Sequence, residues 1–477
     1  MKRRTFLRAG LAGTALAFST QLRANGEERK DSAMSDATAV PVKPFEFEEM
    51  SIAALQQAMR AGSHTSRTIT EKYLERIRDL DKRGPALNSV IELNPDVLAI
   101  AEDLDKERKA GKVRGPLHGI PILVKDNIDT GDRMQTTAGS LALVGQPAAR
   151  DAYIIERLRG RGAVILGKTN LSEWANIRST NSTSGWSARG GLTRNPYALD
   201  RNPSGSSAGS GAAASANFCA AAVGTETDGS IISPSAANGL VGIKPTVGLL
   251  SRSGIIPISH SQDTPGPMAR TVADAAALLT ALTGIDPRDP ATISSRRDAA
   301  PDYTAFLKPD ALRGARIGVA RKFFGVNERL DKAITNAIEA IKHAGATVIE
   351  PVDVPTGSEL AAAEILVLLF ELKAGLNSYL AERALKEGPR TLADLIKFNE
   401  ANRGTEMKYF GQNRFVQAEE KGPLTAKEYL DALSKNHSLA CERGIDSVAR
   451  KFKLDAFIAP SRIPAWNGTN AWPRHAS

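Results

Sequence analysis

Short apolar runs alternate with helical patterns along most of the chain. The runs cover residues 122–124, 163–166, 220–223 and 240–243. Alanine-rich or amphipathic stretches separate several of them, at residues 151–161, 207–218 and 272–282. Short buried strands that alternate with helices are typical of an α/β fold with a covered sheet. The pattern therefore predicts an α/β domain built on a central, buried, mixed sheet.

The flanking segments predict further helices. Residues 51–61 and 66–80 each begin at a serine, which caps helix N-termini well. Asn94-Pro95 opens a third helix, with proline at its first position, and Gly111 closes it. Residues 316–320 and 347–349 are expected as strands around a helix at 332–343, and residues 360–387 as one long helix. With more helix through residue 448 and no internal repeat, one large domain with a helical late portion is the simplest interpretation.

The N-terminus has the pattern of a secretory leader. Arg3 and Arg4 precede an apolar run at residues 9–18, which is too short to span a bilayer. This order is typical of a twin-arginine signal peptide, here residues 1–24. It predicts a periplasmic or secreted protein without stable membrane insertion after leader removal. The alternative is a basic tail on a cytosolic protein. The polar residues 25–44 are expected to form a flexible segment.

Composition narrows the classes of partner. The chain has 477 residues, of which 42% are hydrophobic and 24% are charged, as in globular proteins. The net charge is +9, and five of the basic residues lie in the acid-free first 24, so the remainder carries only +4. Without a basic block the sequence gives no support to nucleic-acid binding. It does not predict the oligomeric state.

The two cysteines and six histidines show no metal-ligand spacing. We therefore expect neither a metal nor a cofactor. Cys219 lies in an apolar run and is expected to be a small core residue. It could pair with Cys441 in an oxidising compartment, but we expect both thiols to be free.

Three stretches carry candidate chemistry: GIPILVKDNID, where an apolar strand ends at Lys125, NPSGSSAGSGAAA, which contains Ser206 and Ser207, and GTETDGSIISPSAANG, which places Ser230 directly behind a glycine. No histidine lies close to Ser230 in the sequence to accept its proton. Burial disfavours an ammonium ion, and a lysine becomes a base near neutral pH when its pKa falls from about 10.4 toward ~7–8. A neutral Lys125 could then relay a proton from Ser230 through Ser206.

These stretches resemble the amidase signature family. The glycine- and serine-rich signature runs from SGSSAGSG through TETDGS to GIKPT, and GKTNLSEWAN and SQDTPGPMARTVADA fit as well. The resemblance covers about residues 45–460. It implies a central mixed sheet covered by helices on both faces, and a serine–cis-serine–lysine triad. In this triad Lys125 would be the base, Ser206 the bridging serine after a cis peptide, and Ser230 the nucleophile.

The resemblance also implies an oxyanion hole and a substrate class. The hole would consist of the backbone N–H groups of Thr227, Asp228, Gly229 and Ser230. Through GWSARGG, TETDGS and IIPISHSQDT the chain looks most like the bacterial peptide amidases, which implies hydrolysis of C-terminal peptide amides to the free acid and ammonia. Many family members carry an arginine two positions after the nucleophile. Here that position is Ile232, and the peptide amidases likewise lack this arginine.

Several rival interpretations remain. Lys168 ends another strand and His118 lies near Lys125, but we expect both to be structural. Gly205–Gly209 satisfies the G-x-S-x-G motif, which would make Ser207 the nucleophile of an α/β-hydrolase. That motif must follow a buried strand, and the preceding RNPYALDRNPS is polar and broken by proline. The remaining alternatives are a catalytically impaired amidase homologue and an amidotransferase A-type subunit.

The C-terminal sequence departs from the family pattern. The apolar FIAPS at 457–461 is expected to be a core strand, and the amidase domain is expected to span residues 45–465. Residues 466–477 form an atypical tail where family members continue for several dozen residues. We expect this apparent truncation to reduce solubility and activity.

Overall fold

The computed structural model describes residues 42–294, 299–356, 359–383 and 388–461. The expected signal peptide, residues 25–41 of the expected flexible segment and the tail at 466–477 lie outside these ranges. From Phe45 onward the described residues belong to one compact unit. None of the helices in the described ranges is long and apolar enough to cross a membrane.

Six strands form the central sheet, in the order β1–β3–β2–β6–β8–β7. They are β1 (Val90–Leu93), β2 (Pro121–Lys125), β3 (Val164–Thr169), β6 (Ala221–Glu226), β7 (Val241–Gly242) and β8 (Thr264–Ala269). The three middle strands β3, β2 and β6 are parallel, whereas β1, β8 and β7 join by antiparallel pairing. The prediction of a mixed sheet in an α/β fold is confirmed.

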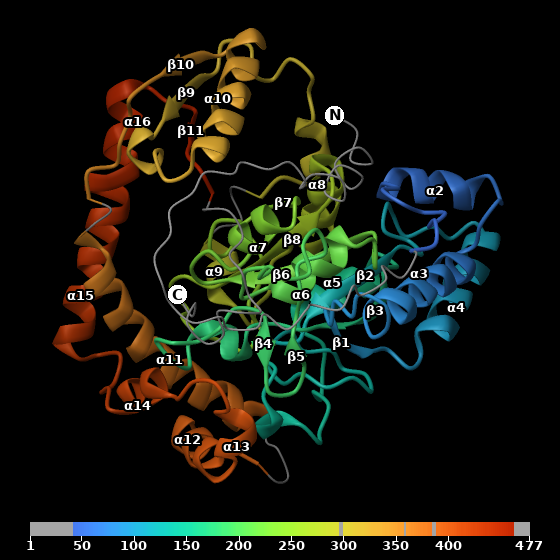
Figure 1. Ribbon diagram of the computed structural model, residues 1–477, viewed down its shortest axis with the longest axis horizontal. Helices are drawn as coiled ribbons and strands as arrows, with labels where there is room; N and C mark the ends of the chain where they lie inside the picture. Colours follow the sequence, from blue (N-terminus) through green and yellow to red (C-terminus); the bar gives the residue numbers. More distant parts are fainter. Residues whose placement is uncertain (1–41, 295–298, 357–358, 384–387, 462–477) are drawn as a thin grey trace, which may run out of the picture. The chain divides into compact units, whose positions relative to one another are not determined.

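Every residue of β2, β3, β6 and β8 is buried, so both faces of the sheet are covered. This burial explains why these strands appear in the sequence as continuous small or apolar runs without polar alternation. Helix α6 (Ala208–Ser215) packs against β2, β3, β6 and β8, and α8 (Val272–Leu282) packs against β6, β7 and β8. Helix α3 (Ser66–Leu80) packs against β2 and β3, and Figure 1 shows these helices around the sheet.

The remaining helices flank this centre. Before the last strand of the sheet they are α2 (Ile52–Arg60), α4 (Val97–Lys109), α5 (Tyr153–Gly160) and α7 (Ile232–Ala237). After it they are α9 (Pro290–Ser294), α10 (Glu328–His343), α11 (Ala361–Arg383), α12 (Leu392–Ala401), α13 (Arg403–Glu406), α14 (Asn413–Glu419), α15 (Lys427–His437) and α16 (Asp446–Phe452). A two-stranded sheet joins β4 (Trp186–Ser187) to β5 (Gly191–Leu192). The helical late portion that the sequence predicts is present.

A second sheet corrects one prediction. Strands β9 (Arg316–Val319), β10 (Thr347–Ile349) and β11 (Ala456–Ile458) form a separate three-stranded sheet beside α10 (Figure 1). The run at 457–461 was expected to be a core strand, but β11 pairs with β9, and Ala456 is exposed while Phe457 and Ile458 are half-buried. An apolar run predicts a strand but not the sheet to which the strand belongs. The sequence therefore did not distinguish the central sheet from the separate three-stranded sheet.

Helix boundaries show smaller corrections. Pro95 lies outside α4, which begins at Val97 behind Asp96. Helix α10 begins four residues earlier than expected, because the Asn327 side chain accepts a hydrogen bond from the Leu330 N–H and caps it. The bounds of α8 match the prediction.

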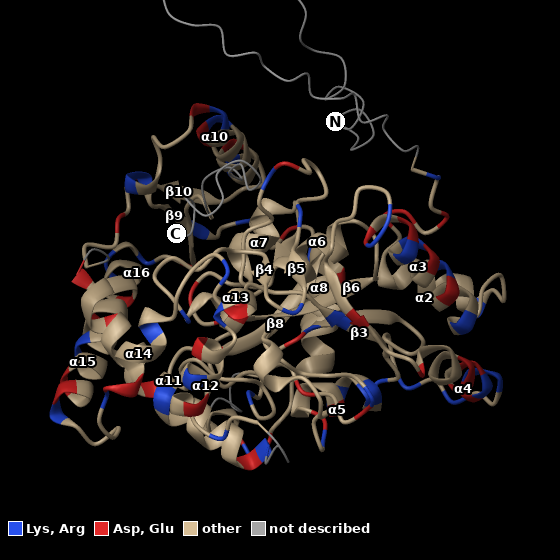
Figure 2. Cartoon of the chain, turned by 60° about the horizontal axis from the view of Figure 1, so that its bottom comes forward, with Lys and Arg blue, Asp and Glu red and all other residues tan. Residues whose placement is uncertain are grey.

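Charges of both signs are interspersed over the outer helices. Figure 2 shows lysine, arginine, aspartate and glutamate together on α4 and α15 rather than a single basic stripe. Helix α4, for example, holds Lys106 near Asp103, with 2.9 Å between Nζ and Oδ1. Such exposed pairs contribute little to stability, because water and salt screen the attraction between their charges.

Helix α6 approaches its neighbours so closely that one glycine is required. A Cβ at Gly209 would lie 2.3 Å from the Ser89 carbonyl oxygen and 2.4 Å from that of Asn170. Both contacts are with backbone, which cannot rotate away. The small residues of α6 therefore set the position of the segment that contains Ser206.

We predict that Gly209→Ala lowers the free energy of unfolding by about 2–3 kcal/mol, because backbone must move to admit the methyl group. Gly160→Ala is the matched control, since no described heavy atom lies within 4 Å of its added Cβ. This control should be neutral or more stable by up to about 1 kcal/mol. Denaturant unfolding of both variants checks this, and equal effects would contradict it.

Candidate active site

Lys125 is the last residue of β2 and is fully buried. Its Nζ donates to Ser206 Oγ at 2.8 Å, to Thr225 Oγ1 at 2.9 Å and to the Thr225 carbonyl oxygen at 3.2 Å. Strand β2 pairs with β6, which carries Thr225, and α6 begins just after Ser206. The sheet and the helix together bring the lysine and the serine of two distant motifs into contact.

The amine of Lys125 has the electrostatics of a base. Burial lowers its pKa to about 7, and the negative charges of Glu226 and Asp263 oppose this effect. The direction and size agree with the expectation from the sequence. Near neutral pH the amine therefore exchanges readily between its charged and neutral forms.

Ser206 is fully buried, and the Gly205–Ser206 peptide bond is cis. A Cβ at Gly205 would lie 2.2 Å from Ser172 Oγ, so a larger residue here would have to displace that hydroxyl. The N–H of Ser207 donates to the Ser230 carbonyl oxygen at 3.2 Å, which places the two candidate serines in adjacent segments.

The proposed relay is only partly present as direct contacts. The Lys125–Ser206 hydrogen bond is there, but within the described ranges no hydrogen bond joins Ser206 Oγ to Ser230 Oγ. Ser230 is 8% exposed, whereas Ser206 is fully buried. Ser230 is therefore the more exposed of the two residues.

The segment 227–230 has the features of an oxyanion site. No backbone N–H of Thr227, Asp228, Gly229 or Ser230 donates a hydrogen bond to another described residue. Gly229 adopts a φ of 73°, which its lack of a Cβ permits. Four consecutive free N–H groups offer donors to an oxygen that develops negative charge.

Glu226 fixes the chain on the far side of this segment. Its Oε2 accepts from the N–H groups of Ile231 at 2.6 Å and Ile232 at 2.9 Å. The carboxylate thus satisfies the two amides after Ser230 and leaves the four before them available. The sequence analysis did not single out Glu226.

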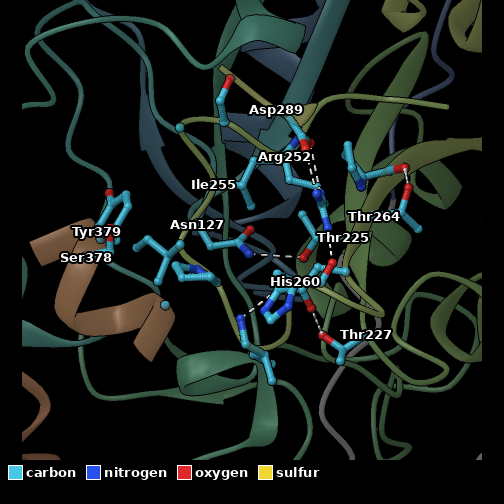
Figure 3. Close-up of a pocket in the computed structure, with 18 of the residues that line it drawn as sticks. Asn127, Thr225, Thr227, Arg252, Ile255, His260, Thr264, Asp289, Ser378 and Tyr379 are labelled. Carbon is cyan, nitrogen blue, oxygen red and sulfur yellow. Dashed lines mark hydrogen bonds and ion pairs between the residues drawn. The ribbon is translucent and has the colours of Figure 1, made fainter. Parts of the chain in front are cut away.

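A cavity of about 450 Å³ lies beside Ser206 and the end of β6 (Figure 3). Ser206, Thr225 and Thr227 line one part of it. Residues 254–258 form an apolar wall on one side, and Gly375 and Tyr379 of α11 lie on another. Of the predicted site residues, Ser206 and Thr227 line this cavity, whereas Lys125, Asp228, Gly229 and Ser230 are not among its lining residues. Its volume is in the range that small-molecule sites usually have.

Three arginines also line the cavity, and each is paired with carboxylates. Arg252 Nη2 lies 2.5 Å from Asp289 Oδ1. Dashed lines mark this pair in Figure 3. Arg288 pairs with Glu156 and Asp286, both at 3.0 Å, and Arg150 pairs with Glu382. The cavity wall therefore presents compensated charge rather than a cationic pocket.

Asn127 is a further site residue that the sequence analysis missed. It lies two residues after Lys125, lines the cavity and is 4% exposed. Its Nδ2 donates to Thr225 Oγ1 at 3.0 Å, and its Oδ1 has no partner among the described residues. The only sequence signal was its place in the KDN triplet of the lysine motif. Its Oδ1 is itself buried, so Asn127 contributes to the site through the Thr225 hydroxyl, which also accepts from Lys125.

The rival residues have structural contacts. Lys168 is buried and donates to the Ile128 carbonyl oxygen and to Thr136 Oγ1 at 2.8 Å. His118 Nε2 lies 2.9 Å from the Leu104 carbonyl oxygen, and burial lowers the pKa of this imidazole. The structural interpretation of Lys168 and His118 is thus consistent with their surroundings.

Ser207 Oγ donates to the Thr225 carbonyl oxygen at 3.1 Å and accepts from the Thr225 N–H, so its hydroxyl is occupied. The segment before Ser206 contains no strand after Leu192 in the described chain, so the α/β-hydrolase interpretation is wrong. Cys219 is buried and both cysteines are free, as expected. Within the described ranges no three His, Cys, Asp or Glu side chains gather as metal ligands would.

Comparison with known proteins assigns the chain to a family. The amidase family model matches residues 68–474, so the chain belongs to the amidase signature family. It is a hydrolase that acts on carbon–nitrogen bonds. The peptide amidase of Stenotrophomonas maltophilia is 51% identical and superimposes with a TM-score of 0.85 over 89% of this chain and 86% of that one.

Two further comparisons show the breadth of the family. An amidase family protein of Bacillus anthracis is 34% identical, with a TM-score of 0.80 over 86% of this chain and 80% of its own. The A-type subunit of the glutamyl-tRNA(Gln) amidotransferase of Chloroflexus aurantiacus is 41% identical over 308 residues, 64% of this chain and 61% of that protein. The expected fold, with a mixed sheet covered by helices, is that of these relatives.

We predict that amidase activity rises with pH through about 7. Below that value Lys125 is protonated and has no lone pair, and its neutral fraction grows as the pH passes the lowered pKa. Lys125→Met should lower kcat/KM by about 10²–10⁴-fold, the usual contribution of a general base. A pH profile of kcat/KM measures both effects.

Lys168→Met is the control for a second buried lysine. This variant should reduce thermal stability, because the Ile128 carbonyl oxygen loses its donor. It should leave in place the acid limb of the pH profile, which is the rise of kcat/KM with pH through about 7. An acid limb that disappears in Lys168→Met but survives in Lys125→Met would show that the base is Lys168.

Proposed function

We propose that this amidase hydrolyses neutral carboxamides, in particular the C-terminal amides of peptides, to the free acid and ammonia. The observation that carries the proposal is the buried Lys125–Ser206 contact beside four free N–H groups and an open cavity. The 51% identity to a peptide amidase supports the substrate class.

In the proposed mechanism Ser230 is the nucleophile. Its hydroxyl attacks the amide carbon while its proton passes to Ser206, whose own proton passes to neutral Lys125. A rotation of the Ser230 hydroxyl toward Ser206 completes the relay when substrate binds. The carbonyl oxygen becomes an oxyanion that accepts from the N–H groups of 227–230.

The proton taken from Ser230 is returned when ammonia leaves, and a proton from water later restores the Ser230 hydroxyl. Protonated Lys125 gives its proton back through Ser206 to the leaving nitrogen, and ammonia departs as the acyl ester forms on Ser230. Water then attacks the ester, the same relay takes its proton, and the acid is released as Ser230 is reprotonated. The proton that leaves with ammonia when the ester forms is replaced by a proton from water when the ester is hydrolysed.

The preference for neutral amides follows from the local charges. Ile232 offers no cation two positions after Ser230, where an arginine could hold a carboxylate in two hydrogen bonds. The arginines of the cavity are already paired with acidic side chains. An anionic substrate would have to displace these partners to gain a counter-charge.

A role as the amidase component of an amidotransferase is the second candidate, and it rests on the 41% identity to the Chloroflexus protein. Such a role predicts transfer of ammonia to an acceptor. Ammonia release from a simple peptide amide by the purified chain alone favours the first proposal. Dependence of turnover on a second protein would favour the other.

We predict that Ser230→Ala abolishes ammonia release, by about 10³-fold or more, because no other group forms the acyl ester. Ser207→Ala should retain much more activity than Ser206→Ala, because the Ser207 hydroxyl is held by Thr225. A covalent serine probe with mass spectrometry checks the assignment. Labelling of Ser207 instead of Ser230 would refute it.

We further predict that a neutral dipeptide amide is hydrolysed with a higher kcat/KM than malonamate, a small dicarboxylic monoamide. The variant Ile232→Arg should narrow the difference by improving KM for malonamate. Steady-state kinetics on both substrates test this. Faster turnover of malonamate by the unmodified enzyme would exclude the neutral-amide proposal.

A further inference from the structure

Asp263 links two segments that border the candidate oxyanion site. It immediately precedes β8, in which Thr264 pairs with Glu226 of β6, so Asp263 lies opposite Thr227. Its Oδ1 accepts from the Thr227 hydroxyl at 2.5 Å. Its Oδ2 accepts from the N–H groups of Ile258 and Ser259, both at 2.8 Å.

The Thr227 contact matters because Thr227 supplies the first of the four free N–H groups. Glu226 fixes the chain beyond Ser230 through the amides of Ile231 and Ile232. Asp263 fixes its beginning through the Thr227 side chain. The segment of free donors is thus held at both ends by carboxylates, and neither carboxylate uses the donors themselves.

Asp263 is also one of two acidic side chains whose negative charge acts on the Lys125 amine, the other being Glu226. Burial raises the pKa of Asp263, and its hydrogen bonds and the positive charge of Arg252 oppose this effect. The remaining titratable group on this loop is His260, whose Nε2 lies 3.4 Å from Glu371 Oε1. Any pH effect of Asp263 must therefore be separated from effects of His260 and Glu371.

A purely structural role for Asp263 would be to close the loop at 258–263, but Glu371 of α11 already anchors that loop. Its Oε2 accepts from the hydroxyl of Ser259 and from the N–H of Ser261 at 3.1 Å, and its Oε1 accepts from Tyr429 at 2.7 Å. Glu371 holds the same loop without contacting Thr227. It therefore serves as the internal control.

We propose that Asp263 is a positioning residue of the amidase reaction, whose carboxylate holds Thr227 in place for the oxyanion and whose negative charge acts on the amine of Lys125. This proposal rests on the proposed function of Lys125 and the 227–230 segment. It assigns to one side chain an influence on both the donors and the base.

The test is the pH profile of kcat and kcat/KM with a neutral dipeptide amide. In Asp263→Asn, kcat should fall by about tenfold or more, because the donor segment loses an anchor. The acid limb should move to lower pH by about half a unit or more. The lost negative charge no longer stabilises the ammonium form of Lys125, so neutral amine persists at lower pH.

Matched variants separate the two effects. Asp263→Glu keeps the charge, so its acid limb should stay in place while kcat falls. Thr227→Val removes the hydroxyl but neither the backbone N–H nor a charge, and it should lower kcat with little change in KM and no shift of the limb. In Glu371→Gln and His260→Gln the limb should also remain in place.

An unmoved acid limb in Asp263→Asn, or an equal shift in Glu371→Gln, would overturn the proposal. If Asp263→Asn does not fold, Asp263→Glu and Thr227→Val still decide it, since unchanged kcat in both would refute a positioning role. Failure of the proposed function looks different: Ser230→Ala or Lys125→Met would then retain activity whatever happens at Asp263.

Discussion

The burial of one amine at the end of a parallel strand is the constraint on which the rest of the site depends. Lys125 is surrounded by the sheet, Thr225 and Ser206, and water does not reach it. Because the charged form is poorly solvated there, the amine becomes a base at neutral pH. The negative charges of Glu226 and Asp263 keep its pKa from falling further. The surroundings of Lys125 therefore both lower its pKa and limit how far it is lowered.

The architecture serves this constraint by bringing distant motifs to one edge of the sheet. Strands β2 and β6 run parallel, so the lysine at the end of one lies beside the threonine at the end of the other. The small residues of α6 let the segment with Ser206 lie against both strands, and Gly209 marks where the contact with backbone is tightest. The nucleophile candidate then follows β6 in a turn whose N–H groups remain free.

The sequence predicted the individual helices and strands better than it predicted which strands pair and which side chains meet. The apolar runs of β2, β3 and β6 were recognised because both faces of these strands are buried. The end of β6 was placed too early, because polar Thr225 and Glu226 are buried only through tertiary contacts. Lys125 and Ser206 were found by their motifs, but Asp263 and Glu226 were not. Both lie inside the motifs TETDGS and SQDTPGPMARTVADA. Their contacts with Thr227 and with the amides after Ser230 depend on strand pairing and a tight turn, which the motifs alone do not specify. The same limit explains why β11 was assigned to the core.

The paired arginines of the cavity have a consequence for how substrate reaches the enzyme. An ion pair appears from a distance as a dipole, and its field decays much faster than that of an isolated charge. Arg252, Arg288 and Arg150 with their acidic partners therefore exert little long-range pull on an approaching ligand. Encounter would be governed by ordinary diffusion and by the shape of the opening, with little dependence on ionic strength. Such an entrance discriminates among ligands only after contact.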